Sequence, residues 1–175
     1  TRQDDGRDMQ RTGVFMAVAA LPFAPGSRVR PHERTHAGPK EDRRKLTIAT
    51  GANLSPIFLL APDRRGDIAS TLEKVAAGKP WATADALGGH HDVWIVKGPM
   101  ALRLATLASD ENVYIADGHH RYETAVYLRD DRDLPKKWAP GAQRTLAHLV
   151  SFQDPGLAIL PTHRIVEGKA LERQA

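Results

Sequence analysis

The pattern of residues changes sharply within positions 112–127 (NVYIADGHHRYETAVY), and this change limits the possible folds. Val113 to Ala116 are β-branched, aromatic or small residues with polar neighbours, which predicts a short buried strand over residues 112–116. Asp117 and Gly118 then favour a turn. Beyond the turn, a helix from Gly118 to about Arg129 is predicted by apolar residues at i, i+3, i+4 spacing, namely Tyr122, Ala125, Val126 and Leu128.

Three polar residues, His119, His120 and Arg121, fall on the first turn of this predicted helix. Backbone N–H groups there are unpaired and the helix dipole is positive, so the turn favours anions. Arginine can bind a phosphate with two N–H groups, and imidazoles can transfer protons. We therefore expect a phosphate-binding corner, with Asp117 and His120 as candidate catalytic residues and with contacts from Gly118, His119, His120 and Arg121. The alternative is that Asp117 caps the helix and the histidines are solvated.

A second polar cluster lies in residues 29–40 (VRPHERTHAGPK), which Pro31 biases toward an extended conformation. Glu33 can serve as a general base if partial burial raises its pKa. His32, His36 and Glu33 can alternatively bind a metal ion, but their spacing matches no strong zinc pattern, so we rank proton transfer higher. Accessory contacts to substrate are expected from His32, His36 and Lys40. A solvated loop is the remaining interpretation.

The third cluster, Thr162, His163 and Arg164, follows the apolar run LAIL near the end of the sequence. Side chains at the end of a buried strand can project into a site, although a capped turn is equally compatible with the pattern. We predict that the three clusters converge on one substrate.

The rest of the sequence alternates between apolar runs and helical patterns, which predicts an α+β (mixed α/β) fold in one domain over residues 1–175. Residues 79–89 are predicted to be a loop in which Trp81 packs as a cover, and residues 130–141 a flexible insertion. Asp67 is predicted to cap a helix over residues 68–77. Strands are predicted at residues 12–21, 57–61, 91–97 and 145–152, and further helices at 38–50 and 98–108, so a mixed sheet is implied.

Composition excludes several classes of function. The chain has no cysteine, which removes disulfides, thiol catalysis and thiolate metal sites. Its 25 Lys and Arg residues exceed 21 Asp and Glu residues by only four, and no basic stripe is present, so a nucleic-acid partner is not expected. No apolar run is long enough to span a bilayer and no signal peptide opens the chain, which favours a cytoplasmic protein with no membrane partner.

Four stretches, PHERTHAGPKEDR, SPIFLLAPD, ADGHHRYETA and DPGLAILPTHRIV, resemble in the same order the motifs of DUF1015, a bacterial and archaeal family of unknown function. The resemblance runs from about Thr12 to Val166. Chains of that family extend on both sides of this region. The sequence is therefore expected to be an excerpt of a longer protein.

The strand, the Asp-Gly-His-His-Arg string and the helix are together similar to the phosphate-binding box of the ParB and sulfiredoxin superfamily, which includes nucleotide-dependent free-serine kinases. This resemblance implies a mixed sheet with flanking helices, with Gly118 at the turn, His120 facing phosphate and Arg121 as the phosphate clamp. Sulfiredoxin chemistry is excluded, because His119 stands where that enzyme needs cysteine.

We therefore expect a phosphoryl-transfer enzyme that acts on a small molecule and uses ATP or ADP, with Mg²⁺ as a possible ion. No Walker loop or dinucleotide-binding fingerprint is present, so the corner would have to supply the phosphate contacts. The alternatives are a nucleotide-binding regulatory module like ParB and a metal-dependent phosphatase or hydrolase.

Overall fold

The computed structural model describes residues 2–4 and 7–159. Along the chain the described elements are β1 (Arg2–Asp4), β2 (Arg7–Met9), β3 (Gly13–Ala19), β4 (Val29–Arg30), α1 (Ala37–Thr50), β5 (Ile57–Ala61), α2 (Asp67–Ala76), β6 (Ala82–Ala86), β7 (Gly89–Val93), α3 (Gly98–Asp110), β8 (Val113–Asp117), α4 (His119–Arg129), the 3₁₀ turn η1 (Lys136–Trp138), α5 (Ala139–Ala142) and β9 (Arg144–Ser151). Within the described residues, no helix is both long and apolar enough to cross a membrane.

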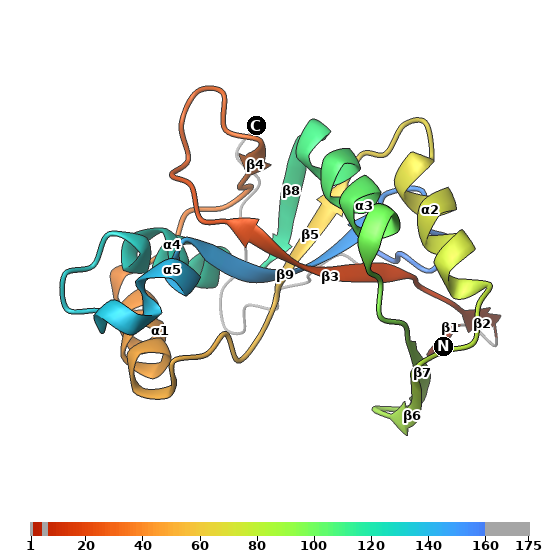
Figure 1. Ribbon diagram of the computed structural model, residues 1–175, viewed down its shortest axis with the longest axis horizontal. Helices are drawn as coiled ribbons and strands as arrows, with labels where there is room; N and C mark the ends of the chain where they lie inside the picture. Colours follow the sequence, from red (N-terminus) through yellow and green to blue (C-terminus); the bar gives the residue numbers. More distant parts are fainter. Residues whose placement is uncertain (1, 5–6, 160–175) are drawn as a thin grey trace, which may run out of the picture.

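Five of the described strands form one sheet in the order β3-β9-β5-β8-β4 (Figure 1). Strand β9 is antiparallel to β3 and parallel to β5, and β8 is antiparallel to β5 and parallel to β4. The other described strands form two separate hairpins, β1 with β2 and β6 with β7. The predicted α+β class and the mixed sheet are confirmed.

One face of the sheet builds the core together with the helices. Alternate residues of a strand point to the same face, and in β5 these are Ile57, Leu59 and Ala61. Figure 1 shows the helices as two groups, α2 beside α3 and α1 beside α4. They contribute Ile68, Leu72, Leu104 and Tyr122 to the same core cluster.

Strand β8 is buried on one face rather than on both. Val113 and Ile115 are 6% and 0% exposed, whereas Tyr114 between them is 43% exposed. The prediction of a buried strand is therefore confirmed at Val113 and Ile115 and wrong at Tyr114. The short apolar run of this strand does not distinguish one covered face from two.

The predicted capping of α2 by Asp67 is wrong. The helix follows a turn in which Asp63 has a positive φ of 42°. The buried carboxylate of Asp63 accepts the backbone N–H groups of Ile68 and Ala69, both at 2.9 Å, while Asp67 lies within the first helical turn. An aspartate four residues before the helix thus satisfies two of the free N–H groups in its first turn.

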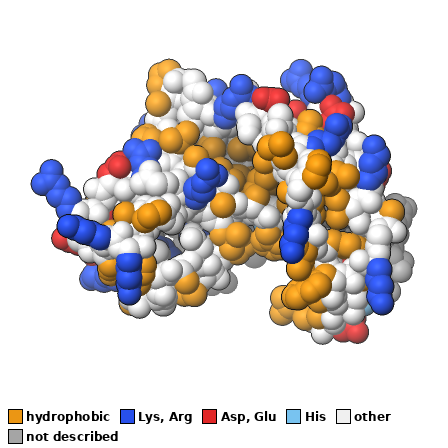
Figure 2. Space-filling model, viewed as in Figure 1, with side chains coloured by type: hydrophobic (Ala, Val, Ile, Leu, Met, Phe, Trp, Pro, Cys, Tyr) orange, Lys and Arg blue, Asp and Glu red, His pale blue; other side chains and the backbone are white. Residues whose placement is uncertain are grey.

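The predicted loop over residues 79–89 contains most of a hairpin. Strands β6 and β7 pair from Ala82 with Val93 to Ala86 with Gly89, and Trp81 is 70% exposed rather than packed. Figure 2 shows exposed hydrophobic side chains on this hairpin, at the lower right. Leu87 and Gly88 at the tip both have positive φ, 53° and 74°, as tight two-residue hairpin turns require. The hairpin could not be recognised from the sequence, because leucine is an unusual residue at a turn position with positive φ.

The segment predicted as an insertion, residues 130–141, contains η1 and most of α5. It contacts α1 through Arg44, which pairs with Asp131 at 2.8 Å and with Asp133 at 3.0 Å. The indole of Trp138 lies against Gly51, the left-handed residue that ends α1.

Candidate functional site

The candidate site lies where the loop of residues 31–36 meets the start of α4. Strand β4 pairs in parallel with β8, Val29 beside Val113 and Arg30 beside Tyr114. Parallel neighbours run in the same direction, so the residues that follow β4 and those that follow β8 emerge at the same end of the sheet. This pairing brings the first and second polar clusters together, although nearly 90 residues separate them along the chain.

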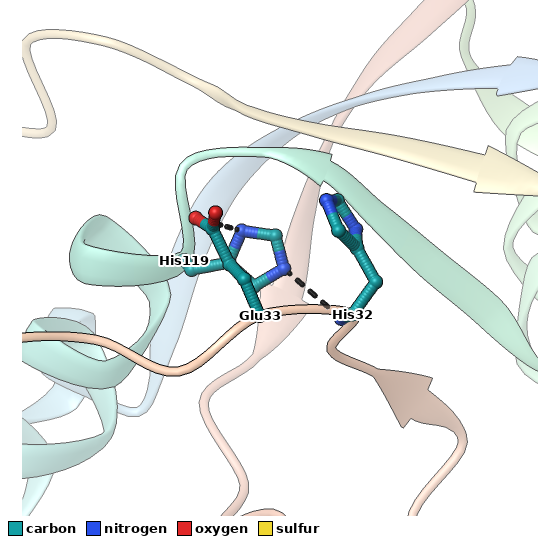
Figure 3. A group of neighbouring side chains, drawn as sticks. All are labelled: His32, Glu33 and His119. Atoms are coloured by element: carbon teal, nitrogen blue, oxygen red, sulfur yellow. Dashed lines mark hydrogen bonds and ion pairs between the residues drawn. The ribbon is translucent and has the colours of Figure 1, made fainter. Parts of the chain in front are cut away.

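His119 is the buried centre of this corner, with only 2% of the residue exposed. Its Nε2 accepts the backbone N–H of His32 at 3.2 Å, and its Nδ1 lies 3.0 Å from Oε1 of Glu33 (Figure 3). A backbone N–H can only donate, so Nε2 carries the lone pair and the proton of the neutral ring is on Nδ1. The imidazole therefore donates to the Glu33 carboxylate.

The electrostatic surroundings of His119 agree with a neutral ring. Burial lowers the pKa of His119, and the charge of Glu33 opposes this effect without reversing it. Desolvation disfavours the charged imidazolium, and the N–H of His32 would face a second donor if Nε2 were protonated. Hydrogen bonding and burial thus favour the same protonation state.

His32 presents a different arrangement. Its Nδ1 lies 2.7 Å from the carbonyl oxygen of Ile115, which can only accept, so Nδ1 carries the proton. Nε2 is left with a lone pair to which no described residue donates. The ring meets that of His119 edge-on, with centroids 4.5 Å apart at 89°. His32 is exposed, and one of its ring nitrogens lies within 4.8 Å of a carboxylate oxygen of Glu33.

His120 holds the other end of the same loop. Its Nε2 accepts the backbone N–H of His36 at 3.1 Å, and the two rings stack with centroids 6.5 Å apart. In this arrangement Nε2 of His120 binds the protein's own backbone and is not directed at a phosphate. The neutral ring keeps one N–H, on Nδ1, for a ligand.

Glu123 connects the loop, α1 and α4. Its Oε2 accepts hydrogen bonds from Thr35 Oγ1 at 2.6 Å and from Lys40 Nζ at 2.9 Å. Burial alone would raise the pKa of Glu123, but these two hydrogen bonds and the charge of Lys40 lower it overall. Lys40, expected to contact substrate, is therefore already paired within the protein.

Sequence reasoning missed Glu123 as part of this network. The signal was present in the spacing, because Glu123 follows His119 by four residues and therefore lies on the same face of α4. Its partner Thr35 had no such signal, since a hydroxyl in a loop has no periodicity to reveal it.

Arg121 lies in the first turn of α4, as predicted, and much of its guanidinium is engaged. Nη1 donates to Ser55 Oγ at 2.6 Å and to the carbonyl of Pro56, and Nη2 donates to Asp117. Asp117 thus pairs with Arg121 and does not cap the helix. In the described part of the chain, the Nε–H and one N–H of Nη2 remain for a ligand.

Gly118 connects β8 to α4 with a φ of +95°, a conformation that residues with a side chain rarely adopt. A Cβ atom at this position would lie 3.0 Å from Nε and Nη2 of Arg121. No described residue accepts the backbone N–H groups of His119, His120 or Arg121. The start of α4 is therefore open to an acceptor, as a phosphate-binding helix start requires.

His32, Glu33 and His119 are also the residues of this corner that could bind a metal ion. Ligand atoms of His32, Glu33 and His119 lie within 4.8 Å of one another. The exposed Nε2 of His32 has the backing carbonyl typical of a metal ligand. His119 does not fit, because binding through Nε2 would displace the N–H of His32 and binding through Nδ1 would remove the proton shared with Glu33. The observed hydrogen bonds therefore favour proton transfer over metal binding.

The structure brings the first two predicted clusters together and leaves the third untested. Glu33 and His36 from the loop contact the α4 residues His119 and His120. Thr162, His163 and Arg164 lie outside the described residues. Convergence on one site is thus observed for the first two clusters.

A comparison with protein families finds one whose model, described as protein of unknown function (DUF1015), matches residues 1–175. No curated protein and no solved structure matches the chain. The resemblance of the core motif to the ParB and sulfiredoxin superfamily therefore stays a prediction.

Proposed function

We propose that the chain, which belongs to the DUF1015 family of proteins of unknown function, is a nucleotide-dependent phosphoryl-transfer enzyme that acts on a small hydroxyl-bearing molecule. The observation that carries the proposal is the position of the Glu33 carboxylate, which is held by His119 beside the open start of α4. A base and an anion site then lie next to each other, as transfer of a phosphoryl group to a hydroxyl requires.

The phosphate end of the nucleotide would lie on the free N–H groups of His119, His120 and Arg121, which Gly118 leaves accessible because it has no side chain. The remaining N–H groups of Arg121 and the free ring N–H of His120 would add donors at the same place. ATP and ADP both fit this description, since the corner recognises phosphate. Mg²⁺ bound with the nucleotide would reduce the repulsion between its phosphates and the carboxylates of Glu33 and Asp117.

Glu33 is suited to the role of general base. Its side chain is 53% exposed, so an acceptor hydroxyl can reach it, while the N–H of His119 fixes the direction of one carboxylate oxygen. Glu33 would take the proton of the acceptor hydroxyl. As it does so, the hydroxyl oxygen bonds to phosphorus and the bond from phosphorus to the leaving nucleotide oxygen breaks. The exposed Nε2 of His32 can accept the proton from Glu33 and pass it to solvent.

The test separates binding from transfer. Calorimetry with ATP and ADP in the presence of Mg²⁺ measures affinity, and phosphorus NMR with excess free serine or glycerol detects a new phosphate ester. Glu33→Gln should keep nucleotide affinity and lose transfer by about 10²–10⁴-fold, the usual contribution of a general base. Glu73→Gln, the same change on the exposed surface of α2, is the matched control.

Each outcome has a distinct meaning. Nucleotide binding without transfer to any acceptor, water included, would favour the regulatory-module alternative. Loss of a phosphate ester without added nucleotide, dependent on a divalent metal, would favour the hydrolase. Absence of nucleotide binding at millimolar concentration would refute the proposal.

A further inference from the structure

A second site is suggested by a pocket on the other side of α4, between the later turns of α1 and the connection to β5. Its walls include Arg43, Asn53, Ser55, Arg121, Thr124 and Thr145. Because α4 has 3.6 residues per turn, Arg121 and Thr124 on the pocket side lie on a different face from His119 and Glu123. The pocket is thus separate from the corner that holds Glu33, although Arg121 borders both.

The polar part of the pocket lining contains several hydrogen-bond donors and no carboxylate. Neither aspartate nor glutamate is among the residues that line it. Arg43 projects from the exposed surface of α1, and no described carboxylate lies within ion-pair distance of it, whereas the next residue, Arg44, pairs with Asp131 and Asp133. Arg121 is balanced by its ion pair with Asp117, so Arg43 is the guanidinium that gives this pocket a local positive potential.

The hydrogen bonds already present determine which groups remain free to donate. Asn53 Oδ1 accepts the hydroxyl of Thr145 at 3.0 Å, so the amide NH₂ of Asn53 has no described acceptor. Ser55 Oγ accepts from Arg121, so its hydroxyl hydrogen is free to donate. The amide of Asn53, the hydroxyl of Ser55 and the guanidinium of Arg43 therefore all lie in one pocket with unused N–H or O–H groups.

We propose that this pocket binds a small oxyanion, a phosphate or carboxylate group, between the guanidinium of Arg43 and the free donors of Asn53 and Ser55. Oxyanions are the ligands that match several converging donors, and arginine binds them through two parallel N–H groups. Leu46, Leu54 and Leu128 also line the pocket, so the molecule that carries the oxyanion has a short apolar part. This site does not depend on the proposed phosphoryl transfer or on nucleotide binding.

The experiment is a ¹⁵N NMR titration of the protein with sodium phosphate and, separately, with sodium acetate at constant ionic strength set by chloride. The side-chain NH₂ of Asn53 is the reporter. We expect it to shift in a saturable way with one or both anions. Arg43→Gln should weaken the binding about tenfold to a hundredfold, the range for loss of a charge-assisted hydrogen bond.

Lys45→Gln is the matched control, because Lys45 lies on the same helix, carries the same charge and does not line the pocket. Arg43 has no described ion pair, so its replacement should leave the thermal midpoint unchanged. Saturation by phosphate alone identifies a phosphate ester as the ligand class, and saturation by acetate alone identifies a carboxylate. Equal weakening in both variants, or no saturable shift of Asn53 with either anion, would overturn the proposal. The anion titration does not depend on Glu33. It can therefore fail while the phosphoryl-transfer proposal survives, and it can succeed while that proposal fails.

Discussion

Replacement of His119 by phenylalanine should destabilise the protein mainly because it removes the acceptor of the His32 backbone N–H, and less because it removes the donor to Glu33. The substitution keeps an aromatic ring in a position that is 2% exposed and removes both hydrogen bonds of the imidazole. The backbone N–H of His32 is partly buried and would lose its acceptor. An unsatisfied buried polar group costs about 1–3 kcal/mol.

The bond to Glu33 should contribute less. The Glu33 side chain is 53% exposed, so water can replace the lost donor, and an exposed ion pair contributes roughly 0–1 kcal/mol. The expected loss for His119→Phe is therefore about 1–4 kcal/mol. Glu33→Gln, whose side-chain oxygen can still accept from Nδ1, should lose less than about 1 kcal/mol.

Urea denaturation monitored by circular dichroism measures both losses, with unchanged m-values as the condition for comparing them. His91→Phe, on the exposed hairpin strand β7, is the control for the same exchange at the surface, where a change within about 0.5 kcal/mol is expected. If His119→Phe falls within that same range, or if Glu33→Gln costs as much as His119→Phe, then the bond from His32 does not anchor the loop.

Burial is the main cause that lowers the pKa of both His119 and His148, so below about pH 6.5 the unfolded chain should bind protons before the folded one does. The free energy of unfolding should therefore be highest above that pH and should fall as the pH is lowered toward the folded-state pKa values. Denaturation midpoints measured across pH 5–8 test this, and midpoints that rise on acidification would contradict it. Asp63→Ala should lower the free energy of unfolding in urea by about 2–4 kcal/mol, because it removes a buried carboxylate that binds two helix N–H groups. Asp67→Ala should lower it by less than about 1 kcal/mol. Equal losses for the two variants would mean that Asp67 caps the helix after all. Arg121→Lys should weaken nucleotide affinity in calorimetry by about tenfold to a hundredfold, because lysine lacks the planar pair of N–H groups, while the same affinity in both proteins would mean that the arginine is structural.

The strand, turn and helix around Gly118 could be predicted from sequence because every local signal agreed. The apolar run ended at a polar turn, the glycine allowed the left-handed conformation, and the apolar spacing changed from that of a strand to that of a helix. Gly51 at the end of α1 is a comparable local signal, because glycine adopts its left-handed conformation without strain. In both places, neighbouring residues alone decide the structure.

The geometry of the site could not be predicted in the same way, because it depends on pairing between distant segments. The loop of residues 31–36 is placed by β4, a strand of two residues that is too short to show any periodicity. Arg121 was expected to be free for phosphate, yet three of its hydrogen bonds go to Ser55, Pro56 and Asp117, and the first two of these follow from how β5 enters the sheet. Sequence gives the chemical types of these residues, but tertiary contacts decide which lone pairs and N–H groups remain available.

The hydrogen bonds of His119 explain why a histidine serves this position better than another polar residue. The imidazole accepts from the backbone of His32 and donates to the side chain of Glu33, which are consecutive residues of one loop. A neutral imidazole has one acceptor and one donor on opposite sides of a rigid ring, so fixing the first determines the direction of the second. Because the ring is buried in the first turn of α4, the helix sets where the Glu33 carboxylate lies relative to its own free N–H groups. The proposed base and the proposed phosphate site are therefore positioned by the same residue.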